Sequence, residues 1–530
     1  MSSKSSDTLT NLPVRHLDKS ILPECLHKER TRVLTPDDLE AKEGGSVVYW
    51  MLRDMRTIDN WALILASWLA KKRKVPLRVL YALPPPPSSA SEHPPALVDL
   101  PMSSRHADFL LGGLALVHAE LRSNHIPFHI VQAPSHTKVG ESVCETLTTV
   151  CQATTVVTDF SPMRHFRQWI ELQALPLLEK EGIPLYQVDA HNIVPVWTAS
   201  PKREVGARTL RSKINRVISD YLTDYPDVDL GRMTNSKKKA DIVLPDFDRK
   251  EYEQYLRLDE SVKPVSWAKP GTAAGMEQFQ DFVKTSLGKY DTLRNDPTHA
   301  KITSNLSPWI NHGHVSFQKI ARQSKKLNKY ANGTASFLEE GIIRRELSDN
   351  YVYYTPNDYD KLSAAAGWAQ ETLQVHSSDP REYVYSLEDL EQGRTHDDLW
   401  NAAQLQVVKE GHMHGFMRMY WAKKILEWTE SPSVALKWAQ YFNDKYALDG
   451  KDPNGFVGVG WSIMGIHDQG WKEREVFGKI RFMNYAGCKR KFKVATFVAR
   501  YPDAAKNVGS ASGKRKAAPA GKPAKSQKVN

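Results

Sequence analysis

The stretch from Trp400 to Trp428, WNAAQLQVVKEGHMHGFMRMYWAKKILEW, constrains the fold of this chain more than any other. It predicts two helices that are separated at Gly411, a residue suited to the left-handed backbone that ends a helix. Thr395 or Asp397 can cap the first helix, because short polar side chains accept from the free N–H groups of a first turn. The stretch therefore predicts a helical body rich in tryptophan.

Spacing places two of the tryptophans together. Trp421 and Trp428 are seven residues apart and share a helix face, with Trp400 one helix earlier. In an arbitrary chain this pattern is most simply an aromatic core stripe, so the rest of the sequence must show whether it does more.

The first 200 residues have a different pattern. Apolar, β-branched runs predict strands at 46–51, 76–83, 128–131, 154–158 and 184–188, with helical patterns at 61–74, 107–123 and 163–182. Alternating strands and helices predict a parallel α/β sheet with right-handed crossovers. The sheet has no GxGxxG and no GxxxxGK[ST], so an ordinary dinucleotide or P-loop site is not expected. Arg53, Asp54 and Asp59 are expected to form a solvated strand end.

Length and composition predict a two-domain protein. At 530 residues the chain exceeds the size at which a single core stops growing, and 41% hydrophobic residues with 14 Trp support large cores. No run of 18 apolar residues and no apolar signal core occur, so neither a membrane span nor secretion is expected. The four cysteines show no metal-ligand spacing and are expected to be reduced thiols of an intracellular protein, with no metal site.

The net charge of +11 is unevenly distributed. Residues 503–530 contain seven Lys or Arg and one acid, so this tail alone contributes +6. Six basic residues between Lys202 and Arg216 face one acid, Glu204, and Lys237–Lys239 follow. This cluster is either a solvated basic helix or a guide for a DNA backbone. Residues 465–493 interleave eight Lys or Arg with five aromatic residues, a pattern typical of nucleic-acid binding.

From Gly275 the pattern is helical. The segment TSNLSPW, from Thr303, places hydroxyls and an amide ahead of a helix that begins at Ser307-Pro308. Free N–H groups at a helix start can hold a phosphate.

The run from Trp400 to Phe492 resembles, almost without interruption, the flavin-binding domain of class II cyclobutane pyrimidine dimer photolyases, members of the photolyase/cryptochrome family. WMLRDMRTIDNWAL, TDFSPMR and VDAHNIVPVW resemble, more loosely, the photolyase antenna domain. The resemblance implies an α/β N-terminal domain with a parallel, Rossmann-like sheet and an all-α C-terminal FAD-binding domain. We expect a disordered arm at 1–33, the antenna domain at 34–200, a linker at 201–250, the catalytic domain at 251–502 and a disordered basic tail at 503–530.

The same resemblance implies an FAD site. Its residues are Tyr290, Thr303, Ser304, Asn305, Leu306, Ser307, Arg418, Asn443, Asp449 and Asn454. Arg418 and Asp449 match an ion pair beside the isoalloxazine, and burial of either charge is costly unless it is paired. Asn443 matches the asparagine next to flavin N5, where a neutral amide can accept from a protonated N5 without adding negative charge. Asn454 could instead be a turn residue.

Implied catalytic residues are Glu340, Asn443, Met419 and Trp461. Glu340 matches the glutamate that hydrogen-bonds the pyrimidine dimer, although Glu340 and Arg344 could also be an i,i+4 ion pair. Arg344 stands where some relatives carry a tryptophan that flanks the dimer, so one wall of the lesion pocket differs.

Further roles follow from the resemblance. Trp421, Trp400 and Trp428, in that order outward from the flavin, match the electron-transfer tryptophans. The residues expected to contact DNA are Arg294, Asn295, Arg344, Trp471, Lys472 and Arg481.

The implied function is light-dependent repair of cyclobutane pyrimidine dimers in UV-damaged DNA, a lyase reaction in which reduced FAD lends one electron. A cryptochrome-like photoreceptor that binds FAD without repair is the alternative, and a DNA-binding protein without flavin is a third class. The antenna domain is expected to hold a deazaflavin, a folate or nothing. A monomer is the default, and KRKAAPAGKPAK, from Lys514, resembles a nuclear localisation signal or serves as a generic basic tail.

Overall fold

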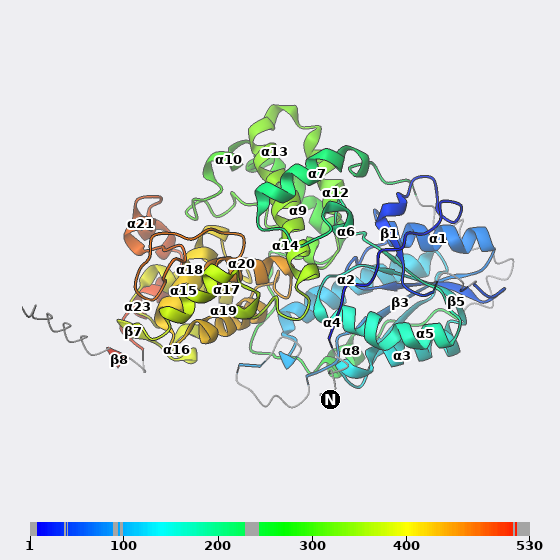
Figure 1. Cartoon of the computed structure of the whole chain (residues 1–530), viewed down its shortest axis with the longest axis horizontal. Coiled ribbons are helices and arrows are strands. Elements are labelled where there is room, and N and C mark those ends of the chain that lie inside the picture. The colour runs from blue at the N-terminus through cyan, green and yellow to red at the C-terminus, as the bar shows by residue number, and fades with distance from the viewer. Residues whose placement is uncertain are drawn as a thin grey trace, which may run out of the picture.

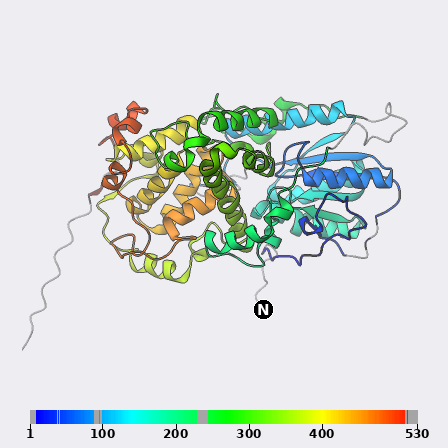
Figure 2. The same cartoon turned by 90° about the horizontal axis from the view of Figure 1, so that it is seen from above.

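The computed structural model describes residues 8–36, 39, 41–87, 94–95, 99–227, 243–511 and 515–516. These residues form an α/β body and a helical body that lie side by side along the long axis of the molecule (Figures 1 and 2). The α/β domain and the helical domain that the sequence predicts are thus both present.

A six-stranded sheet organises the α/β body. Its strands are β1 (Thr31–Val33), β2 (Ser46–Met51), β3 (Leu77–Leu83), β4 (Phe128–Gln132), β5 (Ala153–Asp159) and β6 (Leu185–Val188). Their spatial order is β1-β6-β5-β2-β3-β4, and only the edge pair β1–β6 is antiparallel. The five strands predicted from apolar runs are confirmed as the parallel part of this sheet.

Helices cover both faces of the sheet, which explains why β2 is apolar throughout. Val47, Tyr49 and Met51 pack under α1 (Trp61–Arg73) and α2 (Ser104–Ser123). Val48 and Trp50 pack on the opposite face against α3 (Val139–Glu145) and α5 (Leu175–Lys180). Period-2 alternation therefore buries every residue of β2.

The helical body contains the Trp400–Trp428 stretch at its centre. Helix α17 (Asp398–Glu410) is capped by Asp397, whose side chain accepts from the Trp400 N–H, and it ends at Gly411 with φ of 65°. Helix α18 (Gly415–Trp428) follows, and Ser431 caps α19 (Pro432–Tyr446). Both predicted helices and the stop at Gly411 are confirmed.

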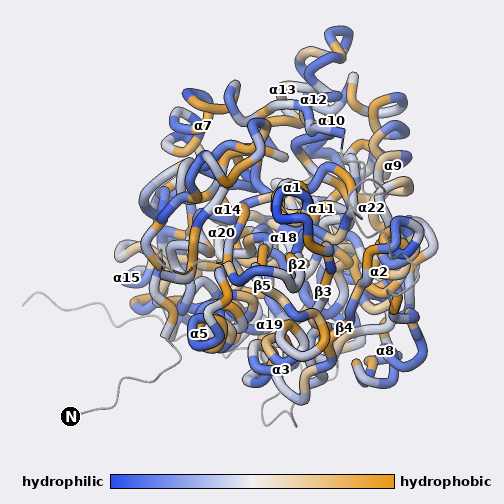
Figure 3. The backbone as a smooth tube through the Cα atoms, turned by 90° about the vertical axis from the view of Figure 1, so that its right-hand side faces the viewer, coloured by the Kyte–Doolittle hydropathy of each residue, from blue (hydrophilic) through white to orange (hydrophobic). Residues whose placement is uncertain are grey.

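The remaining helices complete this body. They are α9 (Thr272–Thr285), α10 (Tyr290–Leu293), α11 (Ser307–Asn311), α12 (Phe317–Lys325), α13 (Ala331–Leu338), the π-helical segment η10 (Glu339–Arg344), α14 (Arg345–Tyr354), α15 (Gly367–Val375), α16 (Leu387–Glu391), α20 (Pro453–Met464), α21 (Tyr485–Lys489), α22 (Val494–Val498) and α23 (Pro502–Lys506). Hydrophobic and hydrophilic residues alternate along most of these helices, as amphipathic packing requires (Figure 3).

The structure differs from the expected domain limits at both ends. Leu9, Leu17 and Leu22 of the presumed disordered arm are buried, because they pack against other parts of the fold. At the other end, α23 packs on α17 and Ala504 is fully buried, so the helical body continues past residue 502.

The expected linker is also largely structured. Helix α7 (Ala207–Tyr221) buries Leu210 and Ile214 against the helical body, and α8 (Arg249–Leu256) packs on α2 of the α/β body. Lys237–Lys239 and most of the presumed nuclear signal lie outside the described residues. Within the signal, only the backbone of β8 (Arg515–Lys516) is described, paired with β7 (Tyr383–Val384).

The described part of the chain contains no helix with the length and apolar character that a bilayer crossing requires. Cys25, Cys144, Cys151 and Cys488 are all free thiols.

Candidate functional site

A cleft in the helical body, called here the central cavity, gathers most of the residues expected to bind FAD. Its empty volume is about 890 Å³, open mouth included. Of the ten expected residues, nine line it, and they come from α10, the 303–307 segment, α18, the 449 loop and α20. The tertiary fold thus brings together residues that are up to 164 positions apart (Tyr290 to Asn454).

The 303–307 segment forms a polar wall of the central cavity. The Thr303 hydroxyl donates to Asn305 Oδ1 at 2.8 Å, and Asn305 takes a left-handed φ of 53°. Ser304 Oγ accepts from the Leu306 N–H at 3.4 Å. This compact turn presents hydroxyl and amide groups to the cavity rather than to the core.

Arg418 and Asp449 form the expected ion pair. Arg418 donates from one guanidinium nitrogen to both carboxylate oxygens of Asp449, at 3.2 and 3.4 Å, and from the other to Asn443 Oδ1 at 3.3 Å. Burial alone would raise the pKa of Asp449, but Arg418 and His412 lower it below its usual value. Asp449 therefore stays ionised in the cavity wall.

Asn443 is the expected cofactor residue that does not line the central cavity directly. It is 3% exposed and lies behind Gly455, which does line the cavity. A Cβ atom at position 455 would approach Asn443 Nδ2 to 2.8 Å. Glycine at position 455 therefore keeps only a thin wall between the amide of Asn443 and the cavity.

Glu340 stands at the mouth of the central cavity in η10. Its carboxylate pairs with Arg294 at 2.9 Å, whereas Arg344 pairs with the neighbouring Glu339 at 3.7 Å. The i,i+4 pair considered for Glu340 and Arg344 is therefore not the one that forms. Burial, together with the Glu340 carboxylate, raises the pKa of Tyr290 in the adjacent wall to about 12.

His191 is a cavity residue that sequence reasoning missed. Its Nδ1 lies 3.2 Å from Asp54 Oδ1, and its buried Nε2, in the wall of the cavity, has no hydrogen-bond partner. Burial lowers the pKa of His191 to about 4, so the ring is neutral. With Nδ1–H directed to Asp54, Nε2 is an acceptor for a ligand hydroxyl. The other lining residues not predicted are Ile310, Asn311, Phe317, Phe337, Gly341, Arg345, His412 and Gly455, whereas Asp452 was, with Asn454, a second candidate in the loop DGKDPNG.

The donor set of the central cavity fits FAD. Hydroxyls and amides of the 303–307 segment suit a pyrophosphate, and the acceptor at His191 Nε2 suits a sugar or ribityl hydroxyl. Phe317, Phe337 and Tyr290 provide aromatic surface, and Arg418 with Asp449 provides paired charge. Ligand sites commonly combine such apolar walls with a few convergent polar groups.

The three tryptophans expected to transfer electrons form a contiguous buried chain. Trp421 lies one turn after Arg418 on α18, and the Trp400 indole N–H donates to its carbonyl at 3.0 Å. The rings of Trp400 and Trp428 pack edge to face with centroids 5.7 Å apart. Trp428 in turn lines a surface pocket with Tyr383 and His396. Gln404, which accepts from the Trp421 indole at 2.8 Å, was not predicted.

Met419 and Trp461 lie apart from Glu340. They line a second hollow, called here the basic aromatic groove, together with Trp471, Lys472 and Arg481. Arg481 lies 4.1 Å from the Trp471 ring centroid and 5.4 Å from that of Trp461. The other lining residues are Phe416, Arg474, Phe482, Met483, Asn484, Gly487, Cys488, Arg490 and Lys491. Five basic residues and no acid thus line the groove.

Three residues expected at the DNA, Arg294, Asn295 and Arg344, line neither hollow, although Arg294 pairs with Glu340 at the cavity mouth. Arg344 is half exposed on η10, and Asn295 is exposed next to Arg294. Arg344 therefore places an exposed cationic side chain at the position where some relatives carry a flat tryptophan ring.

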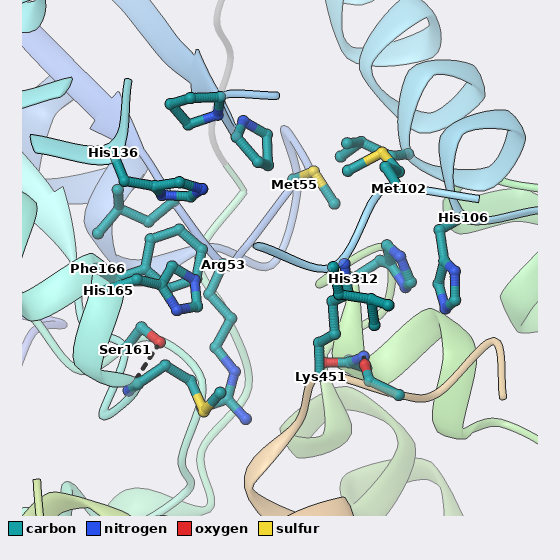
Figure 4. A pocket seen from close by; sticks show the side chains of 18 of the residues that line it. Arg53, Met55, Met102, His106, His136, Ser161, His165, Phe166, His312 and Lys451 are labelled. Carbon is teal, nitrogen blue, oxygen red and sulfur yellow. Dashed lines mark hydrogen bonds between the residues drawn. The ribbon is translucent and has the colours of Figure 1, made fainter. Parts of the chain in front are cut away.

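The sequence left open a deazaflavin or folate in the antenna domain, but it did not indicate the position of the third hollow, called here the interdomain cavity. It lies between the carboxyl ends of β2, β3 and β5 and the loop around Lys451, with an empty volume of about 1090 Å³. Figure 4 shows His136, His165 and Phe166 on one side and Met102 and His106 on the other, with His312 and Lys451 below. The Pro84–Pro87 run, which follows β3, and the TDFSPMR segment border this space, but neither indicates a cavity by itself.

Arg53 separates the two cavities. The prediction of a solvated strand end is wrong for Arg53 and Asp54, which are 5% and 0% exposed. Arg53 lines the interdomain cavity and donates to Asp349 Oδ2 at 2.6 Å and to Asp452 Oδ2 at 3.2 Å. Because Asp452 lines the central cavity, this ion-pair cluster is a common wall.

Comparison with known proteins identifies relatives along nearly the whole chain. The family described as DNA photolyase matches residues 47–229. A protein of Potorous tridactylus described as a deoxyribodipyrimidine photo-lyase is 47% identical over 481 residues, which are 90% of this chain and 85% of that protein. A protein of Oryza sativa subsp. japonica with the same description is 44% identical over 485 residues, 89% of this chain and 90% of its own length.

Solved structures share the fold. A bacterial class III photolyase from Agrobacterium tumefaciens superposes with a TM-score of 0.62 at 17% identity, covering 88% of each chain. A cryptochrome from Synechocystis sp. PCC6803 also gives 0.62, at 13% identity, covering 86% of this chain and 88% of its own. At these identities the two structures establish the architecture alone.

Proposed function

This chain belongs to the DNA photolyase family, and we propose from that premise that it is a light-dependent lyase that splits cyclobutane pyrimidine dimers in DNA. The observation that carries the proposal is the convergence of the 303–307 hydroxyls, the Arg418–Asp449 pair and Glu340 on one cavity. Relatives at 44–47% identity over about nine tenths of the chain are described as deoxyribodipyrimidine photo-lyases. The photoreceptor alternative is not favoured by these relatives, and the fold is common to both classes.

The residues of the central cavity would hold FAD, which in its reduced form supplies light absorption and a reversible one-electron donation. The 303–307 segment binds the pyrophosphate through hydroxyls and N–H groups, and His191 Nε2 accepts from a hydroxyl. Arg418 and Asp449 orient the ring system with paired charge, and Asn443 presents a neutral amide through the Gly455 wall. None of these groups needs to move a proton for the dimer to open.

Glu340 would contact the dimer. At the cavity mouth it can exchange its pairing with Arg294 for a hydrogen bond to the pyrimidine carbonyl side, and so stabilise charge that develops during ring opening. Met419 and Trp461 would line the space for the flipped dimer from the groove side. Trp471 and Arg481 would occupy the gap in the duplex, because aromatic and cationic side chains can replace an extruded base.

Trp428, Trp400 and Trp421 would carry an electron inward from the surface pocket toward the cavity. Their contacts are continuous and dry, since all three are at most 2% exposed. This relay would keep the cofactor reduced, whereas repair itself consumes no electron.

We also propose that the interdomain cavity holds a second, light-harvesting chromophore. Its wall combines Phe166 with four histidines, and the basic side chains of Lys451 and Arg53 suit an acidic aromatic molecule such as a deazaflavin or a folate. The test is the near-UV and visible spectrum of the purified protein after addition of each chromophore. Light absorbed by the bound chromophore should drive repair. If the protein binds neither the deazaflavin nor the folate, this part of the proposal is wrong.

The protein is further proposed to act as a monomer in the nucleus. The basic tail that contains Lys514 is the feature that motivates the location. Removal of residues 512–530 should then redistribute a fluorescent fusion to the cytoplasm, and an unchanged distribution would contradict the location.

The function is tested with reduced protein and an oligonucleotide that carries one thymine cyclobutane dimer. Recovery of thymine absorbance is followed with and without blue light, beside the same assay on a (6-4) lesion. Light-dependent recovery on the cyclobutane lesion alone is expected. Bound, photoreducible FAD without recovery would place the protein among photoreceptors, and failure to bind FAD would leave a DNA-binding protein.

A further inference from the structure

Helix α7 carries a cationic surface that neither cavity uses. Lys202, Arg208 and Arg216 are exposed, and no ion pair is found for them among the described residues. Arg211 and Arg344, with side chains 38% and 50% exposed, lie beside them. These five residues are called the α7 surface.

The acids near this surface are already engaged. Glu204 is 3% exposed and accepts from the Ser200 hydroxyl and from Lys213 Nζ. Glu339 pairs with both Arg211, at 2.6 Å, and Arg344, at 3.7 Å. One shared carboxylate against five cations leaves the α7 surface strongly positive. Asp220 is the remaining acid of α7 and lies in its last turn.

The α7 surface begins at the mouth of the central cavity. Helix α7 packs against η10, and Figure 1 shows it beside α13 and above α14. Glu339, the ion-pair partner of Arg211 on α7, directly precedes Glu340, whose carboxylate pairs with Arg294 at the cavity mouth.

The α7 surface also adjoins the basic aromatic groove. A Cβ atom at Gly206, the residue before α7, would lie 3.8 Å from the His467 carbonyl oxygen. His467 lies close enough to Arg203 and Arg344 for both charges to lower its pKa, in addition to the larger effect of burial. Four residues later the chain reaches Trp471 of the groove. The segment before the groove and the η10 segment at the cavity mouth therefore both lie next to α7 or the residue before it.

We propose that the α7 surface binds the DNA phosphate backbone on one flank of the flipped-out dimer, as a continuation of the basic aromatic groove. This inference rests on the proposed function and extends its DNA contact onto a helix from the segment between the two domains.

Dimensions and side-chain chemistry agree with this partner. From Arg208 to Arg216 the helix rises about 12 Å, which matches about three or four nucleotides at 3.4 Å each along one strand. Asn215 adds an exposed amide donor to the same helix, whereas the hydroxyls of Thr209, Ser212 and Ser219 already donate to Gly206, Thr209 and Asp220. Such an amide can contact a phosphate without reading sequence.

The test uses the full-length protein in which Lys202, Arg208 and Arg216 are all changed to Gln. Binding to a 20-base-pair duplex with one central thymine dimer is measured in the dark at five salt concentrations between 50 and 250 mM. Each lost phosphate contact should lower the slope of log affinity against log salt by about 0.9, so the triple variant should lose about 2 to 3 units of slope.

A matched control removes the same charge elsewhere. Lys71, Lys74 and Lys250 are exposed on α1, its C-cap and α8, and Figure 1 shows both helices in parts of the molecule away from α7. Their change to Gln should leave the slope within about 0.5 of wild type. Changing Arg208 and Arg216 to Lys should also retain the slope, because the charges remain.

Equal slopes for the triple variant and the control would overturn the proposal. Repair of the same duplex by the wild-type protein in blue light is measured in parallel. Normal repair with an unchanged slope refutes only the α7 surface, whereas absent repair counts against the function on which it rests.

Discussion

The central cavity and the interdomain cavity share one wall but differ in the charge that they present. The central cavity contains the exposed edge of an ion pair, Arg418 with Asp449, whose side chains are 18% and 14% exposed. The interdomain cavity presents histidines whose burial keeps them neutral, among them His106 and His312. The central cavity thus presents an ion pair, whereas the interdomain cavity presents neutral histidine rings together with the basic side chains of Arg53 and Lys451.

The common wall separates the central cavity from the interdomain cavity. Arg53, with Asp349 and Asp452, closes each cavity toward the other and belongs to both domains. Burial alone would lower the pKa of Arg53, but the two carboxylates raise it above its ordinary value, so the guanidinium stays charged. The comparison predicts that changes in this wall affect both cavities and changes elsewhere affect only one.

Replacement of Arg53 by Met should have the largest effect. It leaves Asp349 and Asp452 buried without their cation, which costs about 3–5 kcal/mol of unfolding free energy. Urea unfolding measures the loss. Arg122→Met, at the exposed pair with Asp246, is the control and should cost less than about 1 kcal/mol. Equal losses in the two variants would show that the wall is not structural.

Replacement of Asp449 by Asn should affect only the central cavity. The isosteric change leaves Arg418 partly buried without a charge partner and should weaken FAD binding about 10- to 100-fold, or about 1.4–2.7 kcal/mol. Quenching of flavin fluorescence during titration of the apoprotein measures it. The control is Asp360→Asn, which breaks the similarly exposed pair with Arg164 outside the central cavity. Equal weakening by both variants would refute a local role for Asp449.

Replacement of Glu340 by Gln should separate chemistry from cofactor retention within the central cavity. The amide keeps the shape of the side chain but loses its charge, so we expect about tenfold lower repair yield. FAD binding should stay within about twofold of wild type. Repair yield per absorbed photon and the flavin titration are measured on the same sample. Unchanged repair would show that Glu340 is only the partner of Arg294.

Acid should act on the interdomain cavity through His106, with the smallest effect. His106 Nε2 faces the Ala447 carbonyl at 2.9 Å and Nδ1 faces the Ser103 hydroxyl, so the neutral ring is satisfied. Burial, with Lys451 nearby, lowers its pKa to about 3. Between this value and the unfolded value of about 6.5, the unfolded chain binds a proton that the folded chain does not, so stability falls as the pH is lowered through this window.

His106→Gln should therefore lose less stability than wild type between pH 7.5 and pH 6, by about 0.8 kcal/mol. Urea unfolding at both pH values measures the difference. His299→Gln, at a half-exposed position, is the control for loss of any histidine. If both variants follow the wild-type pH dependence, burial of His106 does not contribute to acid sensitivity.

Periodicity and capping rules were sufficient for the elements of the fold. The five apolar runs form the parallel strands, and α17 begins after Asp397 and ends at Gly411, as expected. These features depend on neighbours within a few residues, so they can be read from sequence. The edge strand β1 was missed because its three residues are too few to show an alternating hydrophobic pattern. They are held in the sheet by pairing with β6.

The residues of the candidate site were predicted only in part, because some of them are identified by contacts with distant residues. Residues of the central cavity were identified through resemblance, and the structure places nine of the ten expected cofactor residues around this one cavity. His191 was missed because a lone histidine carries no signal until its Nε2 is seen without a partner. Arg53 was misjudged because two of its partners, Asp349 and Asp452, lie 296 and 399 positions away.

The sequence by itself determined the α/β and helical halves, the tryptophan-rich helices and the residue types needed for a flavin and for DNA. Only the tertiary structure decided that Met419 and Trp461 line a groove distinct from the cavity of Glu340, that the interdomain cavity exists, and that α7 packs against η10 beside this groove. Local hydrogen bonds and side-chain periodicity fix helices and strands within about ten residues. Cavities and shared walls depend on contacts between distant segments, which the order of residues does not display.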